Sequence, residues 1–196
     1  IALAAVIVRG VWTASTTLGE GEIRGDSVVF YEQGRNLADS FTLSGPFGWR
    51  ATRMPGYPFF LSLVLRSGGT SVAAVQAAKA VLGAGTCALI YAGGVWLSPS
   101  AVLFAGSASV IYYGLVAPCG FIMSECVFAF WLACFFFAWF HWRGQSWATG
   151  LLIGAGLALY LTRPEGIFAG LAVALAGPLA KEGWRRTHSA LLVSCL

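Results

Sequence analysis

Between Lys79 and Arg143 the only charged side chain is Glu125, and the residues around it are almost all apolar. The whole chain is 58% hydrophobic and 10% charged, whereas a soluble domain carries about 25% charged residues. Long apolar runs without alternation do not form the strands of a membrane barrel, so helices remain as the way to satisfy the backbone in lipid. The sequence therefore predicts an all-α integral membrane protein.

Short polar turns separate the apolar runs, which predict a multi-spanning helical bundle with about seven membrane segments. The expected segments are 1–17, 71–96, 101–117, 125–142, 146–161, 167–180 and a last one that starts at 189. Because both chain ends lie inside apolar runs, we expect a fragment of a longer protein. We treat 1–196 as a single transmembrane module, with a long outward loop at 18–70 and a helical transmembrane scaffold at 71–196.

The loop 18–70 concentrates the polar residues of the chain and holds five of its eight acids. A polar loop of this size is costly to keep ordered, which favours a functional role. Residues 27–41 have helical spacing, with Phe30, Gly34 and Leu37 on one face and Gln33 elsewhere, as in a helix on a membrane surface. The apolar run 57–65 is too short to span, so we expect a second interfacial helix or a re-entrant helix there.

Two carboxylates are candidates for chemistry. Asp26 precedes the predicted surface helix, where it can act as a general base toward an acceptor hydroxyl or simply cap the helix. Glu125 is an isolated acid at the mouth of a span, which makes it a functional candidate by default. Its alternative role is also a helix cap, because the helix dipole favours negative charge at the N-terminus.

Three cations lie in or beside apolar segments. Arg163 ends an apolar helix just before Pro164, where a guanidinium can bind a phosphate in bidentate fashion or anchor the helix at the interface. Arg9 and Lys79 are costly in lipid unless they face a cavity or the protein interior. The alternative for both is snorkelling to the interface.

Charge and cysteine content narrow the partners further. The net charge of +4 favours anionic lipid or a phosphate, and the absence of a basic helix or an aromatic-basic stripe argues against nucleic acid. The five cysteines form no C-x-x-C pair and lie in apolar stretches, so we expect them to be small core residues. No His, Cys or Asp cluster has metal spacing; the sequence assigns no cofactor and leaves room for a divalent cation.

Two sequence patterns bear on the orientation of the protein in the membrane: the positions of the tryptophans and the distribution of the arginines. Trp96, Trp142, Trp147 and Trp184 fall at turns on one side, as in an aromatic belt. A positive-inside count would put the loop 18–70 in the cytoplasm, because it carries more arginines than those turns. We expect it to face outward, since its arginines lie among acids and suit phosphate binding.

Four motifs follow one another along the chain. They are Asp26 and Tyr31 in the loop, Arg53-Met54-Pro55-Gly56-Tyr57-Pro58, Ser124-Glu125, and the stretch 156–164, Gly-Leu-Ala-Leu-Tyr-Leu-Thr-Arg-Pro. Taken in order, these motifs resemble the polyprenyl-phosphate-sugar-dependent glycosyltransferases of the GT-C fold, a superfamily that includes the protein O-mannosyltransferases and the bacterial aminoarabinose transferases. The resemblance covers nearly the whole chain. Many relatives have a second acid after the loop Asp, where this chain has Ser27.

The resemblance implies transfer of a sugar from a polyprenyl-phosphate donor to an acceptor hydroxyl, with inversion. Asp26 would be the catalytic base, and Arg163 would contact the lipid phosphate. The acceptor (protein, lipid or polysaccharide) is open, membrane lipids surround the protein, and the expected location is a bacterial inner membrane with the loop outward. The expected substrate-binding residues are Arg53, Tyr57, Lys79, Glu125, Arg163, Arg9 and Tyr31.

A secondary transporter is the alternative, with Arg9, Lys79 and Glu125 along a permeation path. Against it, the two halves of the chain show no clear repeat, and the polar residues are concentrated in one loop. A non-catalytic membrane scaffold is a third interpretation.

Overall fold

The computed structural model describes residues 1–16, 25–48, 50, 52–68, 71–94, 99–141 and 145–176. Within these residues every regular element is a helix, and an isolated bridge between Ser44 and Arg50 is the one β-type contact. The predicted all-α class is confirmed. The expected last segment and the tryptophans at 96, 142 and 184 lie outside the described residues.

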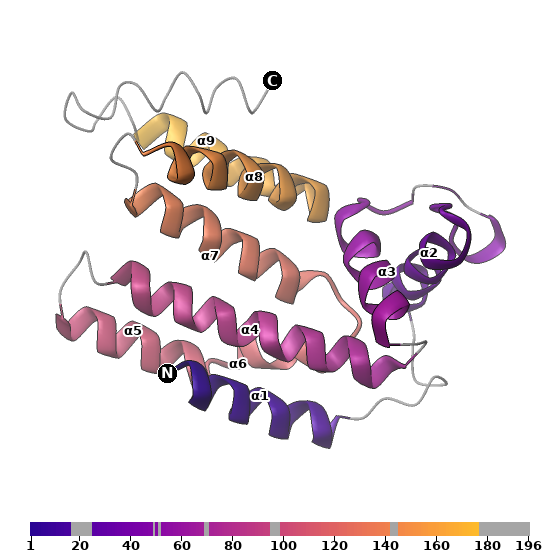
Figure 1. Ribbon diagram of the computed structural model, residues 1–196, viewed down its shortest axis with the longest axis horizontal. Coiled ribbons are helices and arrows are strands. Elements are labelled where there is room, and N and C mark those ends of the chain that lie inside the picture. The colour runs from indigo at the N-terminus through magenta and orange to yellow at the C-terminus, as the bar shows by residue number, and fades with distance from the viewer. Residues whose placement is uncertain are drawn as a thin grey trace.

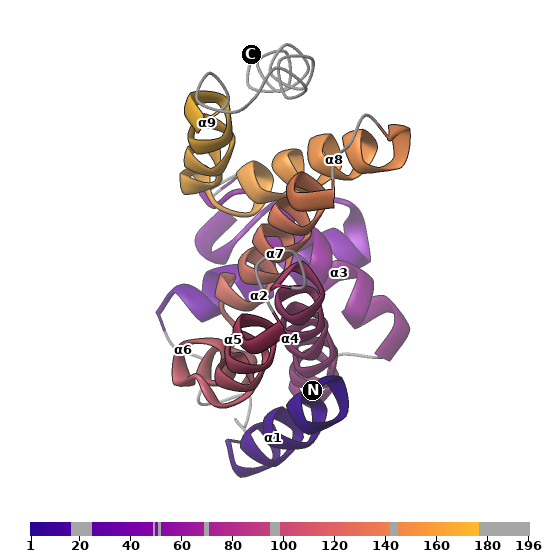
Figure 2. The same ribbon diagram turned by 90° about the vertical axis from the view of Figure 1, so that its left-hand side faces the viewer.

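A bundle of roughly parallel helices forms most of the described chain (Figure 1). Helix α4 is central, because it packs against α1, α5 and α7, and α8 packs on the far side of α7 (Figure 2). The bundle helices are α1 (Ala2–Ser15), α4 (Val72–Gly94), α5 (Pro99–Ile111), α7 (Glu125–His141), α8 (Ser146–Thr162) and α9 (Ile167–Ala176).

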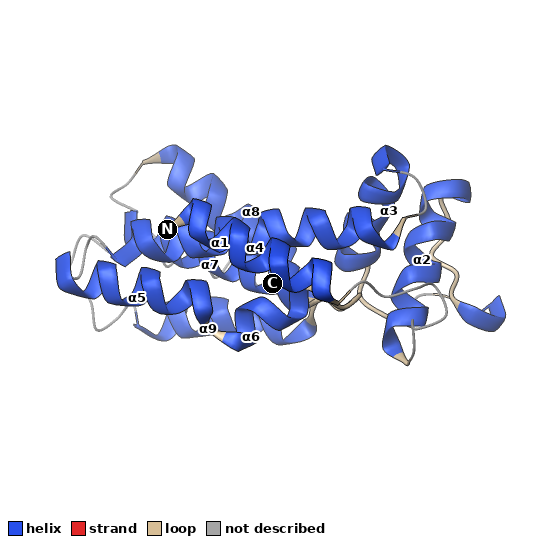
Figure 3. Ribbon diagram, turned by 90° about the horizontal axis from the view of Figure 1, so that it is seen from below, coloured by secondary structure: helices blue, strands red, loops and turns tan. Residues whose placement is uncertain are grey.

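Helices α2 (Asp26–Ser40) and α3 (Gly56–Gly68) lie across one end of this bundle and pack against each other (Figures 1 and 3). A Cβ at Gly34 would stand 2.6 Å from the Cβ of Leu61, so the two helices approach at a residue without a side chain. The predicted helix at 27–41 is confirmed, and the helix expected at 57–65 is longer, with 13 residues. Their position relative to a membrane stays a prediction.

In the described residues, α4 is the one helix long and apolar enough to cross a membrane on its own, with 23 residues. A second span is reached only if the bent pair 102–111 and 113–119 is counted as one. Helices α1, α7 and α8 are apolar but shorter. The count of seven membrane segments therefore stays a prediction.

The segment expected to span at 101–117 is not one straight helix, because the helix breaks at Tyr112; as a membrane span it stays a prediction. Tyr112 has φ −62° and ψ 115°, and the chain bends by 63° between α5 and the following turns, α6 (Tyr113–Val116) and η3 (Ala117–Cys119). Arg9 of α1 donates to the carbonyls of Ser109 and Val110 at 3.3 and 3.4 Å. In an unbroken helix these carbonyls would accept from the amides four residues on. A cation from another helix thus replaces the missing backbone donors.

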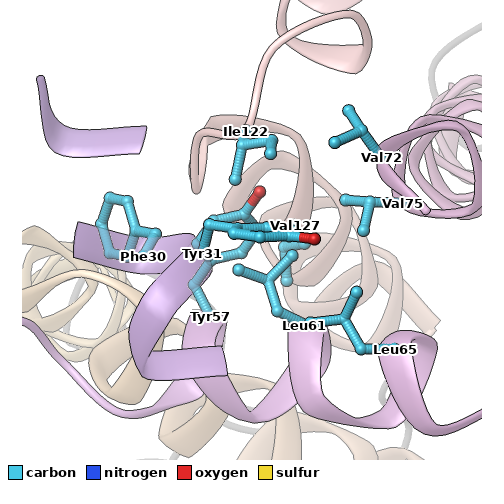
Figure 4. Packing of buried hydrophobic residues seen from close by; sticks show 9 residues of the cluster. All are labelled: Phe30, Tyr31, Tyr57, Leu61, Leu65, Val72, Val75, Ile122 and Val127. Carbon is cyan, nitrogen blue, oxygen red and sulfur yellow. The ribbon is translucent and has the colours of Figure 1, made fainter. Parts of the chain in front are cut away.

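One core cluster fixes the two crossing helices to the bundle (Figure 4). Its side chains come from α2, α3, the start of α4 and both sides of the start of α7, so residues far apart in sequence share one apolar centre. The members are Phe30, Tyr31, Tyr57, Leu61, Leu65, Val72, Val75, Ile122 and Val127.

The end of α8 is enclosed by two close backbone contacts. A Cβ at Gly56, the first residue of α3, would lie 2.7 Å from the carbonyl carbon and oxygen of Leu161. A Cβ at Gly166, in the turn η4 (Pro164–Gly166), would lie 2.5 Å from the carbonyl carbon of Leu159. Backbone atoms cannot rotate aside as a side chain can, so both positions require glycine.

We expect Gly56→Ala to destabilise the protein by about 1–3 kcal/mol, since the added methyl must push α3 away from α8. Gly154→Ala is the matched control. Gly154 lies in the interior of α8, and a Cβ there would meet no other atom within 4 Å. The control should be neutral or more stable by up to about 1 kcal/mol, because Ala favours a helix interior over Gly. Thermal unfolding of the purified protein in lipid measures both, and equal midpoints for the two variants would contradict the packing argument.

Candidate functional site

A cavity of about 490 Å³ lies at the end of the bundle that α2 and α3 cross. Its wall is built from the start of α2, the segment before α3, the start of α7 and the end of α8, which are far apart in sequence. The polar lining residues are Asp26, Thr52, Arg53, Ser124, Glu125, Thr162, Arg163 and Glu165. The structure therefore brings four of the predicted site residues together: Asp26, Arg53, Glu125 and Arg163.

Asp26 and Arg53 form an ion pair at the cavity rim. Gly25 is the N-cap of α2, with φ 60°, and Asp26 is the first helical residue. The N-cap alternative for Asp26 is therefore wrong, because its carboxylate binds Arg53 instead. The Arg53 guanidinium also lies 5.9 Å from the Phe30 ring centre, which favours its position by a cation–π contact.

Glu125 and Arg163 form the second ion pair of the cavity, with Nη1 3.0 Å from Oε1. Arg163 is the C-cap of α8 and is extended, with φ −150° and ψ 136°. The following Pro164 disfavours a helical conformation at this residue, so the helix ends here and the guanidinium reaches the cavity. Glu125 is the first residue of α7, where the helix dipole favours its negative charge.

A third carboxylate, Glu165, lies 3.6 Å from Nε of Arg163. A hydrogen bond from its own backbone N–H lowers the pKa of the Glu165 carboxyl, and Arg163 adds to this shift. Glu165 therefore pairs with the same arginine as Glu125. Two guanidinium groups and three carboxyl groups therefore line the cavity.

Lys79 does not reach the cavity wall. It is fully buried, and its ammonium donates to the carbonyls of Phe121 and Met123, the latter at 3.0 Å. One turn earlier, the Gln76 amide donates to the carbonyl of Gly120 at 2.8 Å. These two side chains of α4 hold the backbone that leads into Glu125. Snorkelling is excluded for Lys79, and its geometry is that of a positioning residue.

Arg9 also lies away from the cavity. Besides the two carbonyls at the end of α5, it contacts the carbonyl of Ala5 at 3.4 Å and Sγ of Cys87 at 3.1 Å. A Cβ at Gly83 would lie 2.6 Å from Nε of Arg9, so the absence of a side chain makes room for the guanidinium. The buried interior expected for Arg9 is confirmed, while its substrate-binding role has no contact in the cavity.

The two tyrosines that were expected to bind substrate belong to the core cluster. The Tyr57 ring packs edge-on against Phe30 at 5.0 Å, and its hydroxyl finds no hydrogen-bond partner in the described residues. Burial raises the pKa of the Tyr57 phenol well above its ordinary value, and the charge of Glu125 adds to the rise. Tyr57 therefore stays protonated and cannot serve as a base. Tyr31 is buried in the same cluster.

The sequence analysis did not identify the hydrogen bond between Gln33 and Thr52, a residue that lines the cavity. Gln33 is fully buried, and its amide nitrogen donates to Oγ1 of Thr52 at 3.1 Å. The expectation that Gln33 lies off the apolar face of α2 is wrong. The available signal was its spacing: Gln33 is one turn from Phe30 and Leu37, so it shares their face.

An apolar groove of about 440 Å³ runs between α4, α5 and α7. Its wall includes Ile90, Leu132 and Phe136, and little of it is polar. A small pocket of about 10 Å³ shares Glu125 with the charged cavity and shares Thr86 and Leu115 with the groove. The charged and apolar spaces therefore lie near each other at the start of α7.

In the described part of the chain no cluster of three or more His, Cys, Asp or Glu residues is arranged to hold a metal ion. Cys87, Cys119, Cys126 and Cys134 are buried free thiols, as expected of core residues, and Cys195 lies outside the described residues. The fold and cavity define an all-helical protein with a charged site at one end of its bundle. Comparisons with known protein families, with curated proteins and with solved structures find no match.

Proposed function

We propose that this protein is a membrane glycosyltransferase that moves a sugar from a polyprenyl-phosphate donor to an acceptor hydroxyl with inversion. One observation carries the proposal: Asp26, Arg53, Glu125 and Arg163 line the same cavity. These residues come from the separate motifs that resemble the GT-C glycosyltransferases.

The chemistry available in this cavity suits the reaction. Asp26 takes the proton of the acceptor hydroxyl, and the oxygen attacks the anomeric carbon as the bond to the donor phosphate breaks. Polyprenyl phosphate leaves with the bonding electrons, so negative charge grows on its oxygens. Fixed guanidinium groups at Arg163 and Arg53 stabilise that charge.

The shape of the site supports a donor that has both a charged head and a long apolar chain. The charged cavity suits the sugar phosphate, and the nearby apolar groove suits the first part of a polyprenyl chain. A soluble sugar nucleotide would leave such a groove empty. The groove therefore favours a lipid-linked donor.

We place the bundle in a bacterial inner membrane, with α2 and α3 on its outer surface. Helices α7 and α8 have 17 residues each and are about 25 Å long, which approaches the hydrocarbon thickness of about 30 Å. The orientation of α2 and α3 across the bundle end suits interfacial helices (Figure 3). Counting the apolar segments beyond the described residues, the proposal includes about seven membrane segments.

The test uses the full-length protein in lipid vesicles with a panel of radiolabelled polyprenyl-phosphate sugars. The acceptors are extracted protein, lipid and polysaccharide. Label that moves to an acceptor as polyprenyl phosphate is released supports the proposal and identifies the sugar. No transfer from the whole panel would contradict it.

The secondary transporter remains the second candidate, because the broken helix α5–α6 beside buried Arg9 resembles the discontinuous helices of transporters. The same vesicles separate the two functions. A transporter would move labelled solute across the vesicle membrane without breaking any bond, and a glycosyltransferase would leave the vesicle interior unlabelled.

A further inference from the structure

Arg163 is already paired with two carboxylates of the protein itself. Its Nη1 binds Oε1 of Glu125 at 3.0 Å, and its Nε lies 3.6 Å from Glu165. The second strong cation, Arg53, is bound to Asp26. Each guanidinium that could receive an anion therefore holds a carboxylate.

The charges that line the cavity disfavour the binding of an anion. The cavity is lined by two guanidinium groups, of Arg53 and Arg163, and by three carboxyl groups, of Asp26, Glu125 and Glu165. Its formal charge is thus negative, and an added phosphate would meet like charges at close range. A phosphate binds well only if one of the carboxylates gives up its arginine.

Glu125 is the carboxylate that a phosphate has to displace, because it is the closer of the two partners of Arg163, at 3.0 Å against 3.6 Å for Glu165. Its contact with Arg163 uses one oxygen, whereas the strong arginine–carboxylate pairs are bidentate, and its Oε2 is buried without a partner in the described residues. The two side chains are 34% and 39% exposed, so the pair is a weak one. Away from Arg163, the carboxylate still lies at the N-terminus of α7, which stabilises a negative charge.

The backbone around Glu125 need not move in such an exchange. Lys79 holds the carbonyls of Phe121 and Met123, and Gln76 holds that of Gly120. Side chains of α4 therefore hold the backbone of the segment before α7 in place. A rotation of the Glu125 side chain alone is enough to release Arg163.

We infer that Glu125 is an internal ligand of Arg163, and that the phosphate of the substrate binds by replacing it. The inference rests on the proposed function, because the incoming group is the donor's phosphate. Arg163 exchanges a one-point contact with a carboxylate for a two-point contact with phosphate oxygens. Glu125 thereby sets how tightly the phosphate binds.

The test measures equilibrium binding of farnesyl phosphate to the full-length protein in lipid, with farnesol as the control for the apolar chain and inorganic phosphate as the control for the free anion. We expect Glu125→Gln to bind farnesyl phosphate about threefold to tenfold more tightly, because it keeps the shape but removes the competing charge. Glu125→Ala is the second variant and should show the same direction. In an Arg163→Gln background, Glu125→Gln should have no effect on affinity.

Asp39→Asn tests for a general charge effect. It removes one negative charge from α2 outside the cavity and should leave the affinity for farnesyl phosphate unchanged. If wild type binds farnesyl phosphate more tightly than farnesol but both Glu125 variants bind it equally or less tightly, the exchange is overturned and the proposed function survives. If wild type binds the phosphate and the alcohol alike, both are overturned. An effect of Glu125→Gln that persists without Arg163 also overturns the exchange.

Discussion

Replacing Asp26 with Asn should lower the turnover of sugar transfer by about a hundredfold or more while the donor still binds. Asn keeps the size and the hydrogen-bonding oxygen of Asp, so Arg53 retains a partner and α2 keeps its start. It cannot accept the proton of the acceptor hydroxyl. The loss should therefore appear in kcat, measured with a saturating radiolabelled polyprenyl-phosphate sugar, with little change in the KM for the donor.

Asp39→Asn is the matched control for this experiment. Asp39 lies on the same helix and pairs with Arg35 four residues earlier, with both side chains more than half exposed. The same chemical change there should leave turnover unaltered. Full activity of Asp26→Asn would show that Asp26 is not the base, and Glu125 would be the next residue to change.

Replacing Arg9 with Met should destabilise the protein by about 2 kcal/mol or more, the net of two opposing effects. The change leaves the carbonyl of Val110 without its Arg9 donor at the broken end of α5, at about 1–3 kcal/mol for a buried group. The carbonyl of Ser109 loses its bond to Arg9 and keeps only the weak thiol donor of Cys87 at 3.3 Å. The change also removes a buried charge, and the recovered desolvation energy offsets part of that cost. The measurement is thermal unfolding of the purified protein in lipid.

Arg35→Met is the control for Arg9→Met, because it removes the same side chain from an exposed position of α2. Its effect should stay within about 0.5 kcal/mol. Arg9→Lys separates charge from geometry, since one ammonium cannot reproduce the planar fork that reaches both carbonyls. Equal unfolding midpoints for Arg9→Met and Arg35→Met would mean that Arg9 does not support the break in α5.

The clustering of the candidate site is consistent with the order of the apolar segments. Because each segment reverses the chain, alternate segment ends lie on the same side of a bundle, and the structure brings Asp26, Glu125 and Arg163 to one cavity. The helix boundaries were also close, since α4 ends at Gly94 where the apolar run ends at 96. Long apolar runs carry these features locally, which is why sequence alone could locate them.

The roles of the buried cations could not be read from the sequence. The run 101–117 contains no charge and no proline, so its own residues do not predict the break at Tyr112. The donor that stabilises the break is Arg9, which is 100 residues away from Ser109 in the sequence. Lys79 likewise gains its role from carbonyls of residues 121 and 123. Contacts of a side chain with distant backbone carry no signature in residue type, because every residue has a carbonyl.

The two glycines that enclose the end of α8 have a consequence for affinity. Gly56 and Gly166 hold the backbone on either side of Arg163 against neighbouring backbone, at separations no side chain would allow. The residue that presents the guanidinium therefore has little conformational freedom left to lose when a ligand arrives. An arginine on a mobile loop would pay that entropy on binding, at about 1–2 kcal/mol for each backbone residue ordered. Here folding has already met that cost, so more of the interaction energy remains for holding the ligand.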